Sequence, residues 1–174
     1  ESLIQDIEDS SREKLDMAGY QRYEVSAYAR ENKACRHNIN YWSFGDYIGV
    51  GAGAHGKLSQ RDGVNRSVRI KSPQSYMEMC EQNQFLWPEN QLSDEDIFFE
   101  FLLNALRLQN GIAQNLFNER TGLDLNHFAD KMRVPMELGL LECGTHIKAS
   151  ATGYSHLNTL LEYFLPETTA SPEA

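Results

Sequence analysis

The segment Ser93-Asp-Glu-Asp-Ile-Phe-Phe-Glu-Phe-Leu-Leu-Asn-Ala-Leu-Arg-Leu108 decides how the second half of the chain folds. Ser93 and Asp96 have the spacing of a capping box, with Asp in the usual Glu position, so a helix is expected to begin here. The residues from Ile97 to Leu108 are apolar on nearly every face, which is typical of a helix buried on all sides. The sequence therefore predicts a central buried helix.

Shorter elements are expected on the carboxyl-terminal side of this helix. The pattern of apolar residues predicts helices near Ala113–Thr121 and Asn126–Met132, and Pro135 is expected to break or restart the chain. The segments Leu140–Cys143 and His146–Ala149 flank a Gly-Thr pair, which predicts a small β-hairpin.

A last helix is predicted near Gly153–Leu165. Its buried face is expected to consist of Tyr154, Leu157, Leu161 and Phe164. Helices followed by a hairpin and a further helix indicate a helical, winged-helix-like carboxyl-terminal domain over residues 89–166. The tail from Pro166, over residues 167–174, is expected to be flexible.

The amino-terminal half is expected to mix helices and strands. Residues 2–18 predict an amphipathic helix that Gly19 ends. Its apolar positions include Leu3, Ile7, Leu15 and Ala18. Tyr23–Ala29 alternates and is rich in β-forming residues, so it predicts one strand, and Tyr47–Val50 predicts the start of a second.

A β-hairpin and a helix are expected next along the chain. Lys57–Lys71 predicts a hairpin that turns around an Asp-Gly pair at 62 and 63. Ser72 and Pro73 predict the start of a helix, because a polar cap followed by proline in the first turn is a common helix beginning. The sequence Trp-Pro-Glu-Asn over 87–90 is expected to be a linker.

The charge of the chain changes across this linker. Residues 1–88 carry 12 acidic and 11 basic side chains, whereas residues 89–174 carry 13 acidic and 5 basic ones. A boundary is therefore expected between a domain over 1–88 and a domain over 89–166. A chain of 174 residues is long enough for one domain or two small ones.

Composition narrows the classes of function. A content of 41% hydrophobic and 24% charged residues is that of an ordinary soluble globular protein. The net charge of −9 argues against sequence-independent nucleic-acid binding, and the acidic second half argues against DNA binding by the winged-helix-like domain. No apolar run suits a transmembrane segment and no signal pattern is present. Three separated cysteines suggest a reducing, cytoplasmic location.

The run Cys35-Arg-His-Asn-Ile-Asn-Tyr-Trp42 carries most of the candidate chemistry. His37 and Tyr41 share a face on either a helix or a strand. An imidazole beside flat aromatic rings suits an iron porphyrin, because imidazole ligates the iron and the rings pack on the macrocycle. From the chemistry alone, an ordinary surface histidine stays the commoner interpretation. Cys35 and His37 lack a second Cys/His pair at ligand spacing, so zinc is not expected.

The segment Gly51-Ala-Gly-Ala-His-Gly56 matches the dinucleotide-binding fingerprint and follows a predicted strand. The fingerprint should also open a helix, whereas a turn is expected here within a few residues. A Rossmann fold is therefore not expected. The glycines instead indicate a strand end that approaches either a ligand or another part of the chain, and both interpretations carry equal weight.

A modest basic cluster lies on the predicted hairpin. Its members are Arg61, Arg66, Arg69 and Lys71. A solvated face is the favoured interpretation of such a cluster. The alternative is a partner for anionic carboxylates, such as porphyrin propionates or the carboxylate of a bound cofactor.

Several motifs together resemble a known family. YEVSAYAR at 23–30, RHNINYW at 36–42 and YIGVGAGAHG at 47–56 occur in that order, followed by FEFLLNALRLQNGI, RTGLD, LGLLE and ATGYSHLNTLL. They resemble the carboxyl-terminal half of HemW-type proteins, which are radical S-adenosylmethionine (SAM) proteins related to oxygen-independent coproporphyrinogen III oxidase. The resemblance implies an α/β plus α fold. This fold combines the last strands and helices of a partial (β/α) radical SAM barrel with the helical, winged-helix-like domain.

The resemblance also implies site residues. In this family an HNxxYW pattern separates the heme-binding chaperones from the true coproporphyrinogen oxidases. The residues that fill it here are His37, Asn38, Tyr41 and Trp42. The pattern implies that these residues bind heme, with His37 contacting the iron. The glycine-rich segment is implied to line the SAM site through Gly51, Ala52, Gly53 and Ala54.

One departure from the family limits what this chain does alone. The CxxxCxxC motif that holds the family's 4Fe-4S cluster is absent, because the cysteines lie at 35, 80 and 143. The chain alone is therefore not expected to hold the cluster or to generate a radical, and no catalytic residue is assigned. We expect a fragment of a longer parent whose cofactors are SAM and the cluster. Exposed barrel strands favour association, so a homo-oligomer or a peripheral membrane contact stays open.

Three functions follow from these expectations. The first is part of a cytoplasmic heme chaperone, whose partners are heme and acceptor hemoproteins and not nucleic acid. The second is oxidative decarboxylation of coproporphyrinogen III by radical chemistry, against which the HNxxYW pattern counts. The third is an interaction module over residues 89–165 that docks a partner or caps the barrel.

Overall fold

The computed structural model of the chain describes residues 2–60, 63–82 and 89–166. The predicted central helix is present as α4 (Asp94–Ala105) and ends at Ala105 rather than Leu108. The Ser93 hydroxyl accepts a hydrogen bond from the Asp96 N–H at 3.2 Å and donates one to the Asp96 carboxylate at 2.6 Å. The predicted helix start with Ser93 as its cap is therefore confirmed, although the Asp96 carboxylate bonds the Ser93 hydroxyl rather than its N–H.

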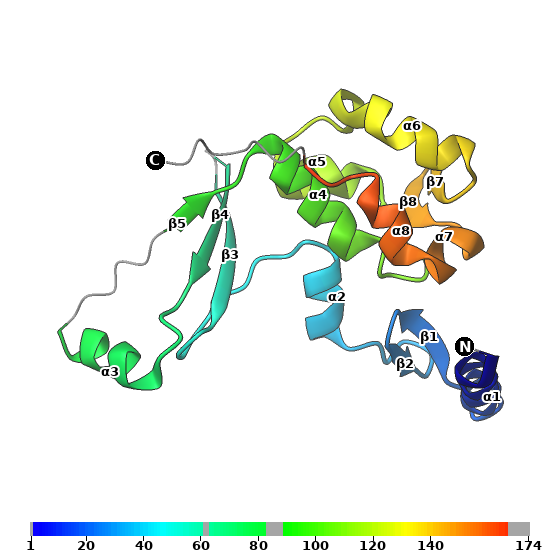
Figure 1. Cartoon of the computed structure of the whole chain (residues 1–174), viewed down its shortest axis with the longest axis horizontal. Coiled ribbons are helices and arrows are strands. Elements are labelled where there is room, and N and C mark those ends of the chain that lie inside the picture. The colour runs from blue at the N-terminus through cyan, green and yellow to red at the C-terminus, as the bar shows by residue number, and fades with distance from the viewer. Residues whose placement is uncertain (1, 61–62, 83–88, 167–174) are drawn as a thin grey trace.

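Four short helices gather around α4 in Figure 1: α5 (Asn115–Thr121), α6 (Ala129–Glu137), α7 (Ala151–Ser155) and α8 (Leu157–Glu162). The 3-10 helix η1 (Leu125–Phe128) leads into α6. A three-stranded antiparallel sheet lies among them, in the order β6 (Ile112–Ala113), β8 (His146–Ala149) and β7 (Leu141–Cys143). The pairing of β7 with β8 confirms the predicted second hairpin.

Phenylalanine rings fill the centre of this helical half. The ring of Phe98 stacks on that of Phe128 at 4.2 Å and meets the rings of Phe117 and Phe164 edge-on. Phe101, one turn further along α4, meets Phe117 edge-on at 4.8 Å. These side chains are almost completely buried, so α4 is the centre of the core, as its sequence predicts.

Pro135 does not break the chain, contrary to the prediction. It lies inside α6, where proline lacks only the N–H that would bond the carbonyl of Lys131. The helix continues past it: the Leu138 N–H bonds the Val134 carbonyl at 3.0 Å, and the Leu140 N–H bonds the Pro135 carbonyl at 2.9 Å. The proline ring itself is buried, so it adds apolar contact to the helix.

The prediction of a single last helix is also wrong, because this segment forms two helices, α7 and α8. His156, with φ −121° and ψ 44°, leaves the helical region between them. The change of direction turns Leu160 into the core beside Leu161 and Phe164, whereas Tyr154 and Leu157 are only half-buried. The helical period alone does not reveal such a break.

The amino-terminal helix is confirmed as α1 (Ser2–Met17). Gly19 follows it with φ +79°, a conformation that favours glycine at the end of a helix. Leu3 and Ile7, two of the expected apolar positions, are exposed, and Leu15 is half-buried. Figure 1 shows why: α1 stands at the edge of the molecule, away from the helices around α4.

The single strand predicted over Tyr23–Ala29 is instead a small hairpin of β1 (Gln21–Glu24) and β2 (Ala27–Ala29). The turn between them is held by long-range and local bonds that no strand pattern encodes. The Val25 N–H bonds the carbonyl of Arg107 at 3.1 Å, and the Ser26 hydroxyl donates to the buried Glu24 carboxylate at 3.0 Å. These bonds favour the turn over a continuous strand.

A second antiparallel sheet projects away from the helices in Figure 1, with strands β3 (His55–Gln60), β4 (Gly63–Val68) and β5 (Glu89–Gln91). The pairing of β3 with β4 confirms the predicted hairpin, although Asp62 at its tip lies outside the described residues. The predicted strand at Tyr47–Val50 is wrong, because only Tyr47 pairs, in a single bridge to Lys57.

The far end of this sheet leads to α3 (Pro73–Glu81), which confirms the helix predicted after Ser72. The Ser72 hydroxyl accepts the Ser75 N–H at 3.4 Å. Glu89 and Asn90, which were expected in a linker, belong to β5, while Trp87 and Pro88 lie outside the described residues. The tail over 167–174 also lies outside them.

A short joint connects the two halves. The N–H of Leu92, between β5 and α4, bonds the carbonyl of Val64 at 3.0 Å, and Ser93 then caps α4. All strand pairs among the described residues are antiparallel. The parallel strands of a (β/α) barrel are not among these pairs, so that part of the fold expectation stays a prediction.

Candidate functional site

The HNxxYW pattern lies on a helix, α2 (Arg36–Trp42), which stands below α4 in Figure 1, between the projecting sheet and the β1–β2 hairpin. The sequence left helix and strand open, and the helix places His37 and Tyr41 one turn apart on one face. Their ring centroids are 5.2 Å apart. The imidazole of His37 is exposed and Tyr41 is half-buried, so an external ligand has access to the imidazole with an aromatic ring beside it.

Tyr41 also contacts Tyr47. Their rings stack at 4.2 Å with an interplanar angle of 24°. Burial raises the pKa of the Tyr41 hydroxyl, and the neighbouring Tyr47 raises it further, against an opposing effect of Arg66. The Tyr41 ring is therefore a neutral, fixed surface next to His37.

The other two residues of the pattern face different neighbours. The Asn38 amide donates to the Tyr23 hydroxyl at 3.1 Å, which ties α2 to the β1–β2 hairpin. The Arg107 guanidinium lies 4.4 Å from the centroid of the Trp42 ring. The indole N–H of Trp42 is buried and has no hydrogen-bond partner in the described part of the chain. The structure thus brings His37 and Tyr41 together, while Asn38 and Trp42 anchor the helix.

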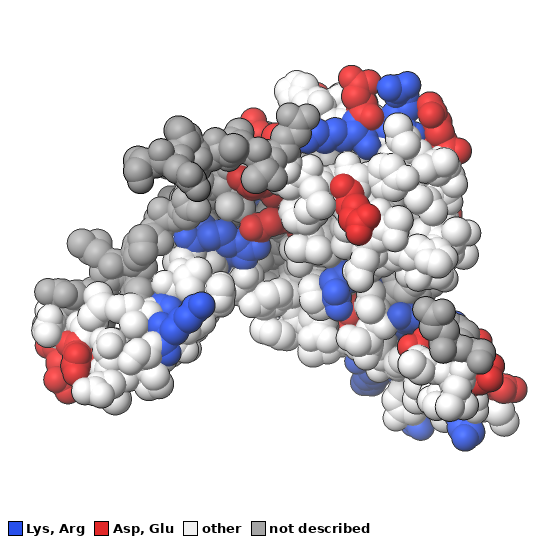
Figure 2. Space-filling model, viewed as in Figure 1, with Lys and Arg blue, Asp and Glu red and all other residues white. Residues whose placement is uncertain are grey.

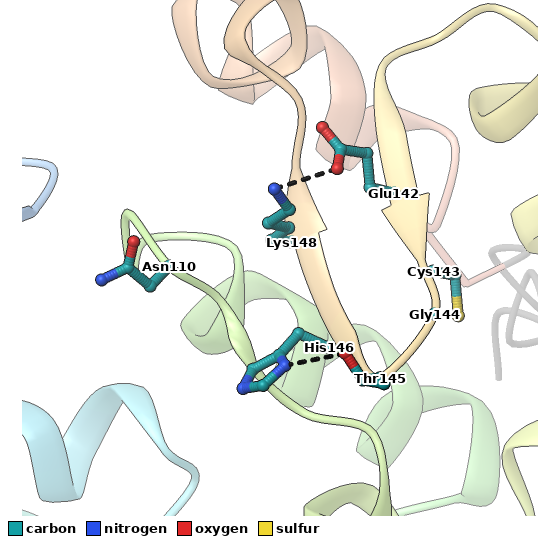
Figure 3. A pocket seen from close by; sticks show the side chains of 7 residues that line it. All are labelled: Asn110, Glu142, Cys143, Gly144, Thr145, His146 and Lys148. Carbon is teal, nitrogen blue, oxygen red and sulfur yellow. Dashed lines mark hydrogen bonds and ion pairs between the residues drawn. The ribbon is translucent and has the colours of Figure 1, made fainter.

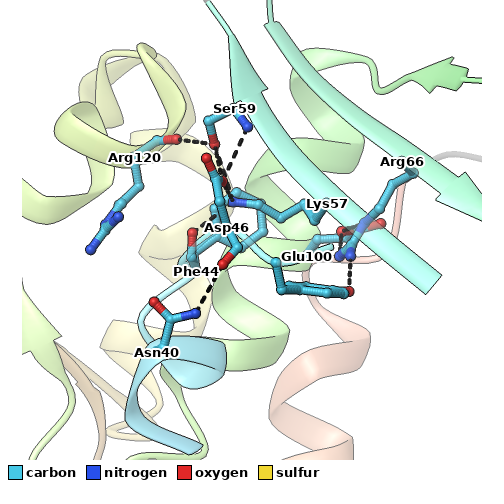
Figure 4. Close-up of polar contacts among 9 residues, drawn as sticks. Asn40, Phe44, Asp46, Lys57, Ser59, Arg66, Glu100 and Arg120 are labelled. Atoms are coloured by element: carbon cyan, nitrogen blue, oxygen red, sulfur yellow. Dashed lines mark hydrogen bonds and ion pairs between the residues drawn. The ribbon is translucent and has the colours of Figure 1, made fainter. Parts of the chain in front are cut away.

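A buried lysine holds the chain just after α2 (Figure 4). The Lys57 ammonium donates to the Phe44 carbonyl at 2.7 Å and to the Ser59 hydroxyl at 3.1 Å, and lies 3.0 Å from the Asp46 carboxylate. Only 1% of the Lys57 side chain is exposed. Burial lowers the pKa of Lys57, and Asp46 opposes that effect.

The Asp46 carboxylate is the charged partner of this lysine. Burial raises its pKa, but bonds from Lys57 and Ser59 outweigh burial, so the pKa is lowered below 3.8. The Asn40 amide of α2 also donates to the Asp46 carbonyl at 3.1 Å. The end of α2 is therefore fixed to β3 by a charged and hydrogen-bonded network.

The described residues of the expected basic cluster lie in different surroundings and do not form one basic surface. The Arg66 guanidinium pairs with the Glu100 carboxylate of α4, as Figure 4 shows. The Arg69 side chain donates to the Gly49 carbonyl at 3.1 Å, and Lys71 is exposed. Arg61 lies outside the described residues. Arg66 and Arg69 thus bind other groups of the same chain, whereas Lys71 faces solvent.

The glycine-rich segment leads into strand β3 and not into a helix, which confirms that it is no Rossmann fingerprint. Its N–H groups are used within the chain. Gly51 donates to the Tyr76 hydroxyl at 3.3 Å, Gly53 to the Ile70 carbonyl at 2.8 Å and Ala54 to the Gly51 carbonyl at 3.2 Å. The four residues Gly51, Ala52, Gly53 and Ala54 stay a predicted SAM lining.

Close packing in this segment occurs at the flanking glycines. A Cβ atom at Gly49 would lie 2.4 Å from the His55 carbonyl oxygen, and one at Gly56 would lie 2.6 Å from the Ser67 hydroxyl. Gly51 has no neighbour within 4 Å of such an atom but has φ +104°. Close approach to another part of the chain therefore explains the glycines at positions 49 and 56. The positive φ explains the glycine at position 51.

A pocket of about 510 Å³ lies elsewhere, at the β7–β8 hairpin (Figure 3). Its lining includes Asn110 and His146, and the Lys148 ammonium pairs with the Glu142 carboxylate at 2.9 Å. The lining is mostly polar and offers no stacked aromatic ring, so it suits a porphyrin less well than the α2 face does.

The described residues contain no group of three or more His, Cys, Asp or Glu side chains that are placed to hold a metal ion. The three cysteines are free and separate, so the residues in this part of the chain do not fit an iron–sulfur cluster. Within the same ranges, no helix is long and apolar enough to cross a membrane. On the face shown in Figure 2, basic and acidic side chains are interspersed, without the basic stripe of a nucleic-acid surface.

Sequence reasoning missed the residues that support Tyr41. The sequence pattern predicts Tyr47 as a strand residue and favours Arg66 as a member of a solvated cluster. It predicts Glu100 within the buried helix and gives it no role. The Arg66–Glu100 contact joins residues 34 positions apart, so no local pattern reveals it.

Comparisons with known proteins show which proteins the chain is similar to. Residues 92–153 match the family model described as the HemN C-terminal domain. The chain is 37% identical to the heme chaperone HemW of Escherichia coli over 96% of its own length and 44% of the relative's. It is 35% identical to the heme chaperone HemW of Haemophilus influenzae, over 96% of the chain and 43% of the relative.

A solved structure of the coproporphyrinogen III oxidase HemN from Escherichia coli, described as a radical SAM enzyme, resembles the fold. Its TM-score is 0.60 at 18% identity, covering 92% of this chain and 40% of that one. The fold is thus related to that of HemN. The chain is thus similar to HemW-type proteins and spans about two fifths of the length of the curated relatives that it matches.

Proposed function

We propose that the chain is part of a heme chaperone and binds heme at the exposed face of α2. The observation that carries this proposal is the exposed His37 imidazole, 5.2 Å from the Tyr41 ring on one helix. A neutral imidazole is a common ligand of heme iron, and a neighbouring aromatic ring offers a surface for the macrocycle. Relatives at 35% to 37% identity carry the name heme chaperone HemW, which supports the same function.

The four residues of the pattern receive different roles in this proposal. His37 contacts the heme iron, and Tyr41 packs beside the macrocycle. Asn38 holds α2 through its bond to Tyr23, and Trp42 orients the helix through its contact with Arg107. Heme is the cargo, and the longer parent delivers it to acceptor hemoproteins in the cytoplasm.

The parent is proposed to supply what this chain lacks. SAM and a 4Fe-4S cluster would bind mainly outside these residues, with Gly51–Ala54 lining the SAM site through backbone atoms. Residues 1–88 would complete the end of a partial (β/α) barrel, and residues 89–166 would form the winged-helix-like domain. This division is supported by the HemN C-terminal domain match over 92–153 and by the related fold of HemN.

Two alternatives remain testable beside this proposal. Radical decarboxylation of coproporphyrinogen III is the first alternative, and the similar fold of HemN supports it. At 18% identity this similarity concerns the fold and not the activity. Anaerobic product formation by the reconstituted parent would overturn the ranking. A docking module over 89–165 is the other alternative, and unchanged heme transfer after its deletion would exclude it.

A hemin titration of the chain tests the heme proposal. His37→Ala should weaken hemin binding about tenfold or more and abolish the Soret shift, because it removes the exposed iron ligand. The matched control is His127→Ala, which removes another exposed histidine from η1, far along the chain. Equal affinity and equal spectra for wild type and His37→Ala would contradict the assignment.

A further inference from the structure

We infer that Tyr47, Arg66 and Glu100 position the Tyr41 ring beside His37 and thereby raise the affinity of the α2 face for heme. This inference rests on the proposed function. None of the three residues belongs to the HNxxYW pattern, and they come from three separate parts of the chain. Their contacts form one continuous path from α4 to the exposed imidazole.

The first step of the path is the stack of Tyr47 on Tyr41. The backbone of Tyr47 is fixed, because its N–H donates to the Lys57 carbonyl at 2.9 Å and its carbonyl accepts the Lys57 N–H at 2.9 Å. Its ring then lies 4.2 Å from that of Tyr41, which in turn lies 5.2 Å from the His37 ring. Strand β3 thus fixes the Tyr47 ring, and the Tyr47 ring fixes the Tyr41 ring beside His37.

The second step is the contact of Arg66 with Tyr47. The guanidinium of Arg66, on β4, donates one N–H to the Tyr47 hydroxyl and lies 5.8 Å from the centre of that ring. Its Nε donates to the Glu100 carboxylate at 2.8 Å, and a second N–H reaches the same oxygen. A guanidinium bound on two sides has a fixed plane, which a lysine ammonium does not reproduce.

The third step anchors the path in the core. Arg66 and Glu100 each have 23% of the side chain exposed, so water screens their interaction only partly. Glu100 lies on α4 next to Phe101, whose ring meets that of Phe44 edge-on at 5.6 Å. Because Phe44 follows α2 directly, α4 holds both the end of α2 and the Tyr47 ring.

The functional consequence is preorganisation. A Tyr41 ring that is already ordered loses less conformational entropy when a flat ligand packs on it. The Glu100 carboxylate contacts this path through the Arg66 guanidinium, which holds Tyr47 and through it the Tyr41 ring. The effect of Glu100 on heme binding should therefore depend on Tyr41. The three residues are therefore positioning residues and do not touch heme.

Hemin titrations of the whole chain test this inference. Tyr47→Leu and Arg66→Met should each weaken binding about tenfold, while Arg66→Lys should not restore it because the ammonium lacks the planar fork. Glu100→Gln keeps the shape of the side chain and provides a milder variant if Arg66→Met fails to fold. The matched control is Glu95→Gln, which removes the partner of Lys131 at the first turn of the same helix.

A double-mutant cycle separates positioning from general damage to the fold. In a Tyr41→Leu background, Arg66→Met should weaken hemin binding no further, whereas its effect on the melting temperature should persist. Equal weakening in both backgrounds, or unchanged binding by folded Arg66→Met and Tyr47→Leu, would overturn the inference. If His37→Ala abolishes binding and Arg66→Met leaves it intact, the positioning role fails while the heme proposal survives.

Discussion

At the scale of single residues, Lys57 is the most constrained side chain near the site. It is buried, yet its ammonium has a carbonyl, a hydroxyl and the Asp46 carboxylate as partners. A buried charge is tolerated only when it is paired and hydrogen-bonded, so Asp46 determines whether the lysine destabilises the fold.

Asp46→Asn is expected to destabilise the fold by about 1–2 kcal/mol at pH 7, since Asp46 is 40% exposed and water screens part of the charge. The folded pKa of Asp46 lies below 3.8, so its stabilisation is fully present above that pH and disappears as the pH falls through the folded pKa. Urea unfolding at several pH values measures this difference. Glu142→Gln, which breaks an exposed pair with Lys148, should cost less than about 0.5 kcal/mol.

The same scale shows how much of the site the sequence can predict. The shared face of His37 and Tyr41 follows from their spacing, and the helix confirms it. The stack on Tyr47 and the Arg66–Tyr47 bond, 19 positions apart, depend on how the hairpin docks against α4. Periodicity and propensity carry no information on such docking, so these contacts could not be foreseen.

At the scale of elements, local signals account for the predictions that are correct. The helix cap at Ser93, the Ser-Pro start of α3 and the hairpins all rest on residues within a few positions of one another. The wrong predictions have tertiary causes. The turn inside Tyr23–Ala29 depends on Arg107, and the break at His156 depends on which leucines meet the core.

Gly111, in the turn before β6, lies close to the backbone of β8. It has φ +61°, and a Cβ atom there would lie 2.1 Å from the Ile147 carbonyl oxygen of β8. Gly111→Ala should therefore destabilise the fold by about 2–4 kcal/mol, through backbone strain and displacement of the β6–β8 pair.

The matched control is Gly122→Ala, which has a similar φ of +74° but no atom within 4 Å of the new Cβ. Strain alone should cost about 1–2 kcal/mol there. Thermal unfolding followed by circular dichroism compares the two variants. Equal losses would show that the close approach to β8 contributes nothing.

At the scale of the whole molecule, stability depends on the aromatic core around α4. Phe98 contacts rings from α5, η1 and the segment after α8, so it joins elements that span most of the second half. Phe98→Ala is expected to cost about 3–5 kcal/mol, from lost burial and the cavity it leaves.

Chemical denaturation measures this loss, with Leu103→Ala as control on the same helix. Leu103 is 38% exposed, so its truncation should cost less than about 1 kcal/mol. A Phe98→Ala variant as stable as Leu103→Ala would mean that the core is not centred on α4.

The joint between β5 and α4 has a mechanical consequence for the molecule. Leu92 is bonded to β4 and Ser93 caps the helix, so both residues between the sheet and α4 are held by hydrogen bonds. We expect these bonds to couple the projecting sheet to α4, so that a displacement of the sheet changes the start of the core helix.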